Sequence, residues 1–141
     1  MLTAKLLGIA AAAALVMGGL GAGVAQAESA PGCSSTVQIG STAYIKDGGE
    51  TAASVKQFKG CGQNWAYIYM WTAYLAHHSG FYMTAAIDAG AEGLGFVRGD
   101  KNQREVWSYG TDTLNMCTRA AGEITFVGSN PLLYTETDQR C

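Results

Sequence analysis

Residues 60–75 read GCGQNWAYIYMWTAYL, and no other segment beyond the first 27 residues is as apolar or as aromatic. Side chains alternate along this stretch with the period of two that a β-strand requires. β-Branched and aromatic residues dominate and helix caps are missing, so a strand is favoured over a helix. Both faces are apolar, which predicts a strand that is either covered on both sides or open on one side for binding. The odd positions carry Trp65, Tyr67, Tyr69 and Trp71, and the even positions carry Ala66, Ile68, Met70, Thr72 and Tyr74.

Outward from this strand, short alternating segments follow one another with turn residues between them. An Asp-Gly-Gly-Glu turn at 47–50 predicts a hairpin, because such turns need residues with positive φ. We interpret the glycine-rich residues 90–95 as a flexible loop, and Ala121-Gly122 as a break. The resulting class is all-β, a small antiparallel sandwich or barrel of about eight short strands. The other predicted strands are 36–46, 51–58, 81–88, 96–98, 104–109, 123–127 and 132–135.

The first 27 residues have the pattern of a secretory signal peptide. Lys5 precedes an apolar run over residues 6–24, and Ala25-Gln26-Ala27 is an A-x-A cleavage site. The sequence therefore predicts a signal peptide at 1–27 and a single β domain at 28–141, secreted to the extracellular space, where it could associate with the cell surface.

Four cysteines follow the predicted cleavage site, and an even number in an exported chain indicates two disulfides. Three pairings are possible. We favour Cys33 with Cys61 and Cys117 with Cys141, because each bond closes a loop of roughly 25 residues and contributes on the order of 3 kcal/mol. No C-x-x-C spacing occurs and the two histidines lie far from the cysteines, so we expect no metal site and no cofactor.

The charge of the chain is low and slightly acidic, with 9 basic and 11 acidic side chains and a formal net charge of −2. No Lys/Arg cluster is present. Phosphate backbones and anionic membranes both need concentrated positive charge, so the sequence argues against nucleic acid and against electrostatic docking on membranes.

Tyr67, Tyr69 and Trp71 are the candidate binding residues. Aromatic rings stack on the apolar faces of sugars, so this row could form a polysaccharide platform, or it could equally be hydrophobic core. Trp65, four residues after Cys61, is expected to pack against the disulfide.

No catalytic residue is assigned. His77 and His78 are adjacent, and in a strand they would point to opposite faces, so at most one could serve as a base. Four carboxylates, namely Asp88, Glu92, Asp100 and Asp112, could pair as an acid and a base only if the fold brought two of them together across a cleft.

Several motifs resemble a known family. Gly32-Cys33-Ser34-Ser35-Thr36, then Val55-Lys56-Gln57-Phe58 and Cys61-Gly62-Gln63-Asn64-Trp65-Ala66, resemble the small secreted YjfA-like proteins of actinobacteria and bacilli. The later Trp107-Ser108-Tyr109 and the segment 117–124 (CTRAAGEI) fit the same pattern. The resemblance implies a small secreted protein and brings no known activity.

Two other resemblances cover less of the chain. Residues 82–87 (YMTAAI), with the later Cys117 and Gly122-Glu123-Ile124, are similar to secreted spore-associated proteins of filamentous actinobacteria. The segment 117–128 is similar to the ending of small secreted α-amylase inhibitors, whose inhibitory Trp-Arg-Tyr triplet is absent here.

From these observations we expect a non-enzymatic extracellular protein, a cell-envelope- or surface-associated binding module. Its expected partner is a cell-envelope polysaccharide or a secreted protein. One alternative is an inhibitor of a hydrolase acting through loops 90–95 and 99–103, because preorganised loops lose little entropy on binding. A third is a small hydrolase or toxin acting through paired carboxylates.

Overall fold

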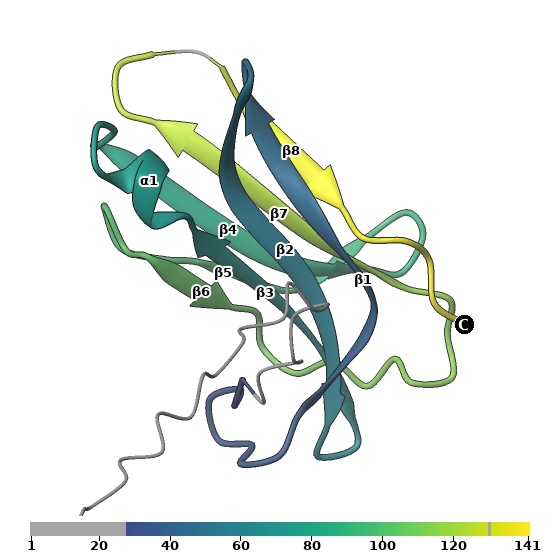
Figure 1. The fold of residues 1–141 in the computed structure, drawn as a ribbon. Helices are drawn as coiled ribbons and strands as arrows, with labels where there is room; N and C mark the ends of the chain where they lie inside the picture. Colours follow the sequence, from purple (N-terminus) through teal and green to yellow (C-terminus); the bar gives the residue numbers. More distant parts are fainter. Residues whose placement is uncertain (1–27, 130) are drawn as a thin grey trace, which may run out of the picture.

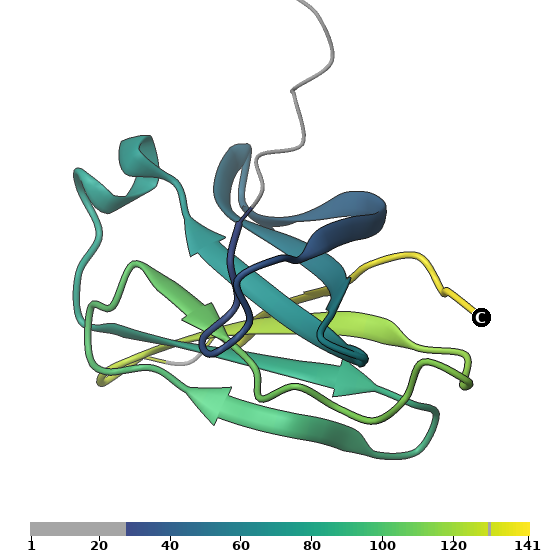
Figure 2. The ribbon, with the colours of Figure 1, turned by 90° about the horizontal axis from the view of Figure 1, so that it is seen from below.

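The computed structural model describes residues 28–129 and 131–141, and these residues form an all-β sandwich of two four-stranded antiparallel sheets (Figure 1). Viewed from below, the two sheets lie as two layers (Figure 2). The predicted fold class is confirmed. The predicted signal peptide at 1–27 lies outside the described residues.

The first sheet contains the aromatic strand and has the order β1-β2-β3-β6. β1 (Val37–Asp47) and β2 (Glu50–Gly60) form the predicted hairpin, in which Gly48 has a φ of 60°. β3 (Gln63–Met70) pairs with β2 on one side and with the short β6 (Glu105–Trp107) on the other.

The second sheet has the order β5-β4-β7-β8. Its strands are β4 (Phe81–Asp88), β5 (Gly93–Arg98), β7 (Arg119–Phe126) and β8 (Leu133–Glu136). β4 and β7 are central and are paired along all eight residues of each strand.

The hydrophobic core lies between the two sheets. Alternation places every second residue of each central strand on its inner face, where apolar side chains leave water and stabilise the fold. From the first sheet the inner residues include Ile45, Val55, Ala66, Ile68 and Met70; from the second they include Phe81, Met83, Ala85, Ile87 and Ile124.

The aromatic stretch 60–75 was predicted as one strand, but in the structure its last residues leave the strand and form a helical turn. β3 ends at Met70, and α1 (Thr72–Leu75) is a single helical turn closed by hydrogen bonds to Trp71 O and Thr72 O. The backbone N–H of Trp71 donates to Ala52 O, so the chain leaves the sheet only after its last cross-strand bond. The turn carries Tyr74 into the core, where its side chain is fully buried.

Two glycine signals were misinterpreted. β7 runs straight through Ala121-Gly122, which we expected to break the strand. β5 begins at Gly93, so half of the expected loop 90–95 is strand, and Gly95 has a φ of +64° beside a register shift between β4 and β5. A glycine inside a strand marks a bulge or a close approach as well as a loop.

Both disulfides have the predicted pairing, Cys33 with Cys61 and Cys117 with Cys141. Among residues 28–129 and 131–141, no helix is long and apolar enough to span a membrane.

Candidate functional site

The outer face of the first sheet carries the aromatic row. The even residues of β3 enter the core, so its odd residues point away from the second sheet. Strand register then sets their neighbours: Tyr67 lies between Lys56 of β2 and Trp107 of β6, and Tyr69 lies between Ser54 and Glu105.

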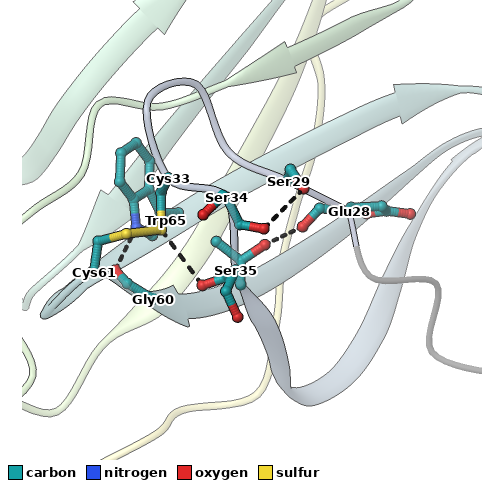
Figure 3. The surroundings of a disulfide bond; sticks show 9 residues. Glu28, Ser29, Cys33, Ser34, Ser35, Gly60, Cys61 and Trp65 are labelled. Carbon is teal, nitrogen blue, oxygen red and sulfur yellow. Dashed lines mark hydrogen bonds between the residues drawn. A yellow bond between two sulfur atoms is a disulfide. The ribbon is translucent and has the colours of Figure 1, made fainter.

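One end of this outer face is covered by the segment that precedes β1. Cys33 and Ala30 pack with Phe58, Trp65 and Tyr67 in a second hydrophobic cluster. The indole N–H of Trp65 donates to Gly60 O at 3.0 Å, beside the disulfide, as Figure 3 shows. The prediction that Trp65 packs against the Cys33–Cys61 disulfide is therefore confirmed.

The other end of the face is open. Tyr69 is half-buried and Trp71, just after β3, keeps 39% of its surface exposed. Both line a hollow of the outer face, which we call the aromatic hollow; its lining residues are Glu28, Ser54, Lys56, Tyr67, Tyr69, Trp71 and Glu105. The row is thus part core and part surface.

Polar contacts hold the base of the aromatic hollow. The Tyr67 hydroxyl donates to Glu105 Oε2 at 2.8 Å, and Lys56 Nζ lies 2.7 Å from Glu28 Oε1. Burial of the ring, reinforced by the hydrogen bond to Glu105, raises the pKa of Tyr67 well above its usual value. The second carboxylate oxygen of Glu28 is buried and has no hydrogen-bond partner among the described residues.

Tyr69 and Trp71 differ in how much of each ring is free to contact a ligand. The Arg104 guanidinium sits 4.9 Å from the centre of the Tyr69 ring and bonds the Tyr69 hydroxyl, so one face of Tyr69 is already in use. The Trp71 indole N–H donates to Ser54 Oγ at 2.7 Å, and the Tyr44 ring lies nearly perpendicular to Trp71 at a centroid distance of 6.0 Å. These contacts fix the Trp71 ring and leave part of it facing solvent.

All three predicted binding residues are therefore brought together, although with different roles. Trp71 and Tyr69 can contact a ligand directly. Tyr67 is only 4% exposed, so it supports Glu105 and does not form a stacking surface.

A second concave surface, which the sequence analysis missed, lies on the outer face of the second sheet. Phe96 and Tyr134 are 60% and 51% exposed and flank a floor of small residues that includes Ala86 and Ala121. Its carboxylates are Asp88, Glu92 and Glu123, and we call this surface the acidic groove. Only the strand order β5-β4-β7-β8 brings these residues together, and that order is not readable from local patterns.

The charges of the acidic groove act on Tyr134. Its hydroxyl bonds the Glu136 carboxylate, and partial burial, this bond and the charges of Asp88 and Glu123 all raise the pKa of Tyr134. Of the four candidate carboxylates, Asp88 and Glu92 line the acidic groove, whereas Asp100 and Asp112 are not among its lining residues.

The opposite-face rule for adjacent residues of a strand does not apply to His77 and His78. They follow α1 in a turn and not in a strand, and their ring centroids are 4.5 Å apart. His77 Nε2 lies 3.1 Å from Glu50 Oε2.

The expected inhibitory loops are both tightly held. Ala89 N–H donates to Glu92 O across the β4–β5 turn. In the 99–103 turn, Asp100 N–H donates to Gln103 Oε1 at 2.7 Å, and Asn102 N–H donates to Phe81 O.

Comparison with family models, with curated proteins and with solved structures found no match. The resemblance to the YjfA-like proteins stays a prediction.

Proposed function

We propose that this protein is a secreted, non-enzymatic binding module of the YjfA-like type that attaches to a cell-envelope polysaccharide through the aromatic hollow. The observation that carries the proposal is the clustering of Tyr69 and Trp71 with two carboxylates and a lysine in one hollow. The two disulfides agree with an extracellular location, because such bonds persist in oxidising compartments.

The chemistry of the aromatic hollow suits a sugar ring. A pyranose has an apolar face that packs on an aromatic ring and a rim of hydroxyls that donate and accept hydrogen bonds. The exposed part of Trp71 offers the ring, while Lys56 and the carboxylates of Glu28 and Glu105 line the same hollow and supply polar partners. Because the ring and its polar neighbours are already fixed, little side-chain entropy is lost on binding.

Sedimentation with isolated cell walls and insoluble polysaccharides tests this proposal. We expect the wild-type protein to pellet with at least one of them, and Trp71→Ala to bind about tenfold more weakly or worse, since each ~1.4 kcal/mol of lost contact costs a factor of ten. Tyr109→Ala is the matched control, because Tyr109 is highly exposed and lies outside the aromatic hollow. Circular dichroism checks that each variant is folded.

Two outcomes would contradict the proposal. Either the wild-type protein stays in the supernatant with every wall and polysaccharide preparation, or folded Trp71→Ala and Tyr69→Ala variants pellet as well as Tyr109→Ala does.

The acidic groove supports a second candidate, the binding of a secreted protein. Two exposed aromatic rings flank a floor of small residues with three carboxylates around it, an arrangement that suits an extended segment carrying Lys or Arg. Fluorescence anisotropy with labelled lysine- and arginine-containing peptides measures this. Binding that weakens with salt and is lost in Phe96→Ala supports it, and equal binding by Phe96→Ala excludes the groove.

A further inference from the structure

Three potential metal ligands meet at one end of the sandwich, outside both surfaces described above. Glu50 begins β2, directly after the β1–β2 hairpin turn, and His77 and His78 lie in the turn between α1 and β4. One ligand atom from each residue lies within 4.8 Å of the others. The sequence separates Glu50 from the histidines by more than a whole strand, which is why spacing alone revealed no metal site.

The hydrogen bond of His78 leaves one of its ring nitrogens free to bind a metal ion. Its Nδ1 lies 3.0 Å from Tyr74 O, and a carbonyl oxygen can only accept, so Nδ1 carries the proton and Nε2 keeps its lone pair. A backbone carbonyl that binds the far ring nitrogen is the usual outer support of a metal-bound histidine. The ring also stacks on Tyr74 at a centroid distance of 3.7 Å, which fixes its plane.

The other two ligands are accessible and already close together. His77 Nε2 and Glu50 Oε2 are 3.1 Å apart, and neither side chain is deeply buried. Ligand atoms bound to a tetrahedral Zn²⁺ at about 2.0–2.2 Å lie roughly 3.4 Å from one another. Small side-chain rotations of exposed groups therefore convert the present cluster into a coordination sphere.

We propose that Glu50, His77 and His78 bind a divalent late transition metal, with Zn²⁺ as the ion to test. Two imidazoles and one carboxylate suit Zn²⁺, and three protein ligands leave a fourth position for water or for a group from a partner. The ion joins β2 of the first sheet to the segment that leads into β4 of the second. It therefore fastens the two sheets together at an end where the described residues contain no disulfide.

Calorimetric titration with ZnCl₂ tests the proposal on chelator-treated protein that carries no polyhistidine tag. We expect one Zn²⁺ per chain and a rise in the thermal unfolding midpoint, because a ligand that binds only the folded state stabilises it. His77→Ala and Glu50→Gln should each weaken binding by more than the roughly 10- to 100-fold that loss of an outer support costs. These two variants are decisive because His78→Ala also removes the stack on Tyr74.

Glu92→Gln is the control, because it removes an exposed carboxylate of the acidic groove. It should bind Zn²⁺ as the wild-type protein does. Absence of binding up to about 1 mM Zn²⁺ overturns the proposal. Undiminished binding by folded His77→Ala and Glu50→Gln variants also overturns it, since the ion then lies elsewhere.

Discussion

Gly122 shows how one missing side chain sets the spacing of this sandwich. It lies in β7 against the first sheet, and a Cβ built on it would meet Val55 Cγ2 at 2.3 Å and Ile68 Cδ1 at 3.1 Å. Both neighbours are fully buried branched residues, so neither can swing into solvent. Packed interiors have few voids to absorb an added methyl group.

We therefore predict that Gly122→Ala destabilises the protein by about 1–3 kcal/mol, the usual cost of overpacking a core. Urea unfolding measures the change. Gly93→Ala in β5 is the matched control, because its Cβ would meet only Ala86 Cβ at 3.7 Å, an ordinary contact. Equal stability of the two variants would contradict the prediction.

The sequence interpretation failed at Gly122 for the same physical reason. Glycine weakens an isolated strand, so Ala121-Gly122 read locally as a break. The benefit of the glycine lies in the opposite sheet, at Val55 and Ile68, which are more than fifty residues away along the chain. Local propensity carries no information about such a contact.

At the scale of elements, the segment before β1 works as a cover held by one disulfide. Cys33–Cys61 keeps Ala30 and Cys33 over Phe58, Trp65 and Tyr67 on the outer face of the first sheet. Glu28 extends the same segment to Lys56, so the cover also forms one wall of the aromatic hollow. A change in this disulfide should therefore reach the proposed binding site.

We predict that the Cys33→Ser, Cys61→Ser double variant loses about 3–4 kcal/mol of stability, because the loop is no longer closed. Its tryptophan emission maximum should also shift to longer wavelength, because the Trp65 indole meets water. Cys117→Ser with Cys141→Ser is the control, since that bond closes a loop of similar length, 24 against 28 residues of separation. This control double variant should lose similar stability and keep the emission maximum of the wild-type protein. The same emission shift in both pairs would show that the cover does not depend on Cys33–Cys61.

Elements with strict alternation were predictable from the sequence, and elements set by tertiary contacts were not. β4 was predicted to the residue, and the β1–β2 hairpin followed from its Asp-Gly-Gly-Glu turn. α1 was missed because a single turn has no periodicity, and it forms where Tyr74 reaches the core and bonds Asp47. The position of His77 and His78 beside Glu50 depends on that turn, so it was missed too.

At the scale of the whole molecule, the two sheets present two different outer faces. The first was partly foreseen, because Tyr67, Tyr69 and Trp71 are odd residues of one stretch that the sequence predicts as a strand, although β3 itself ends at Met70. The second was not, because Phe96, Asp88, Glu123 and Tyr134 come from four strands whose order only the fold defines. Because the aromatic and acidic faces belong to different sheets, the proposed polysaccharide site and the acidic groove can be tested independently.

The alkaline limit of stability is also a property of the whole fold. Burial and neighbouring carboxylates raise the pKa of Tyr67 beside Glu105, of Tyr74 beside Asp47 and of Tyr134 beside Glu136. In the unfolded chain these phenols ionise near pH 10. Above that pH the unfolded state loses protons that the folded state keeps, so folding stability is fully present below about pH 10 and falls as the pH rises towards the folded values.

We predict a decrease of about 3 kcal/mol per pH unit above pH 10 from the buried Tyr67 and Tyr74, with a smaller share from Tyr134, whose exposed half is screened by water. Urea unfolding at a series of alkaline pH values measures the slope. Phenolate absorbance of the folded protein should show fewer tyrosines ionising near pH 10 than that of the unfolded chain. Tyr67→Phe should lower the slope by about 1.4 kcal/mol per pH unit, because it removes one of the retained protons. A slope that Tyr67→Phe leaves unchanged would mean that Tyr67 is not held protonated by the core and Glu105.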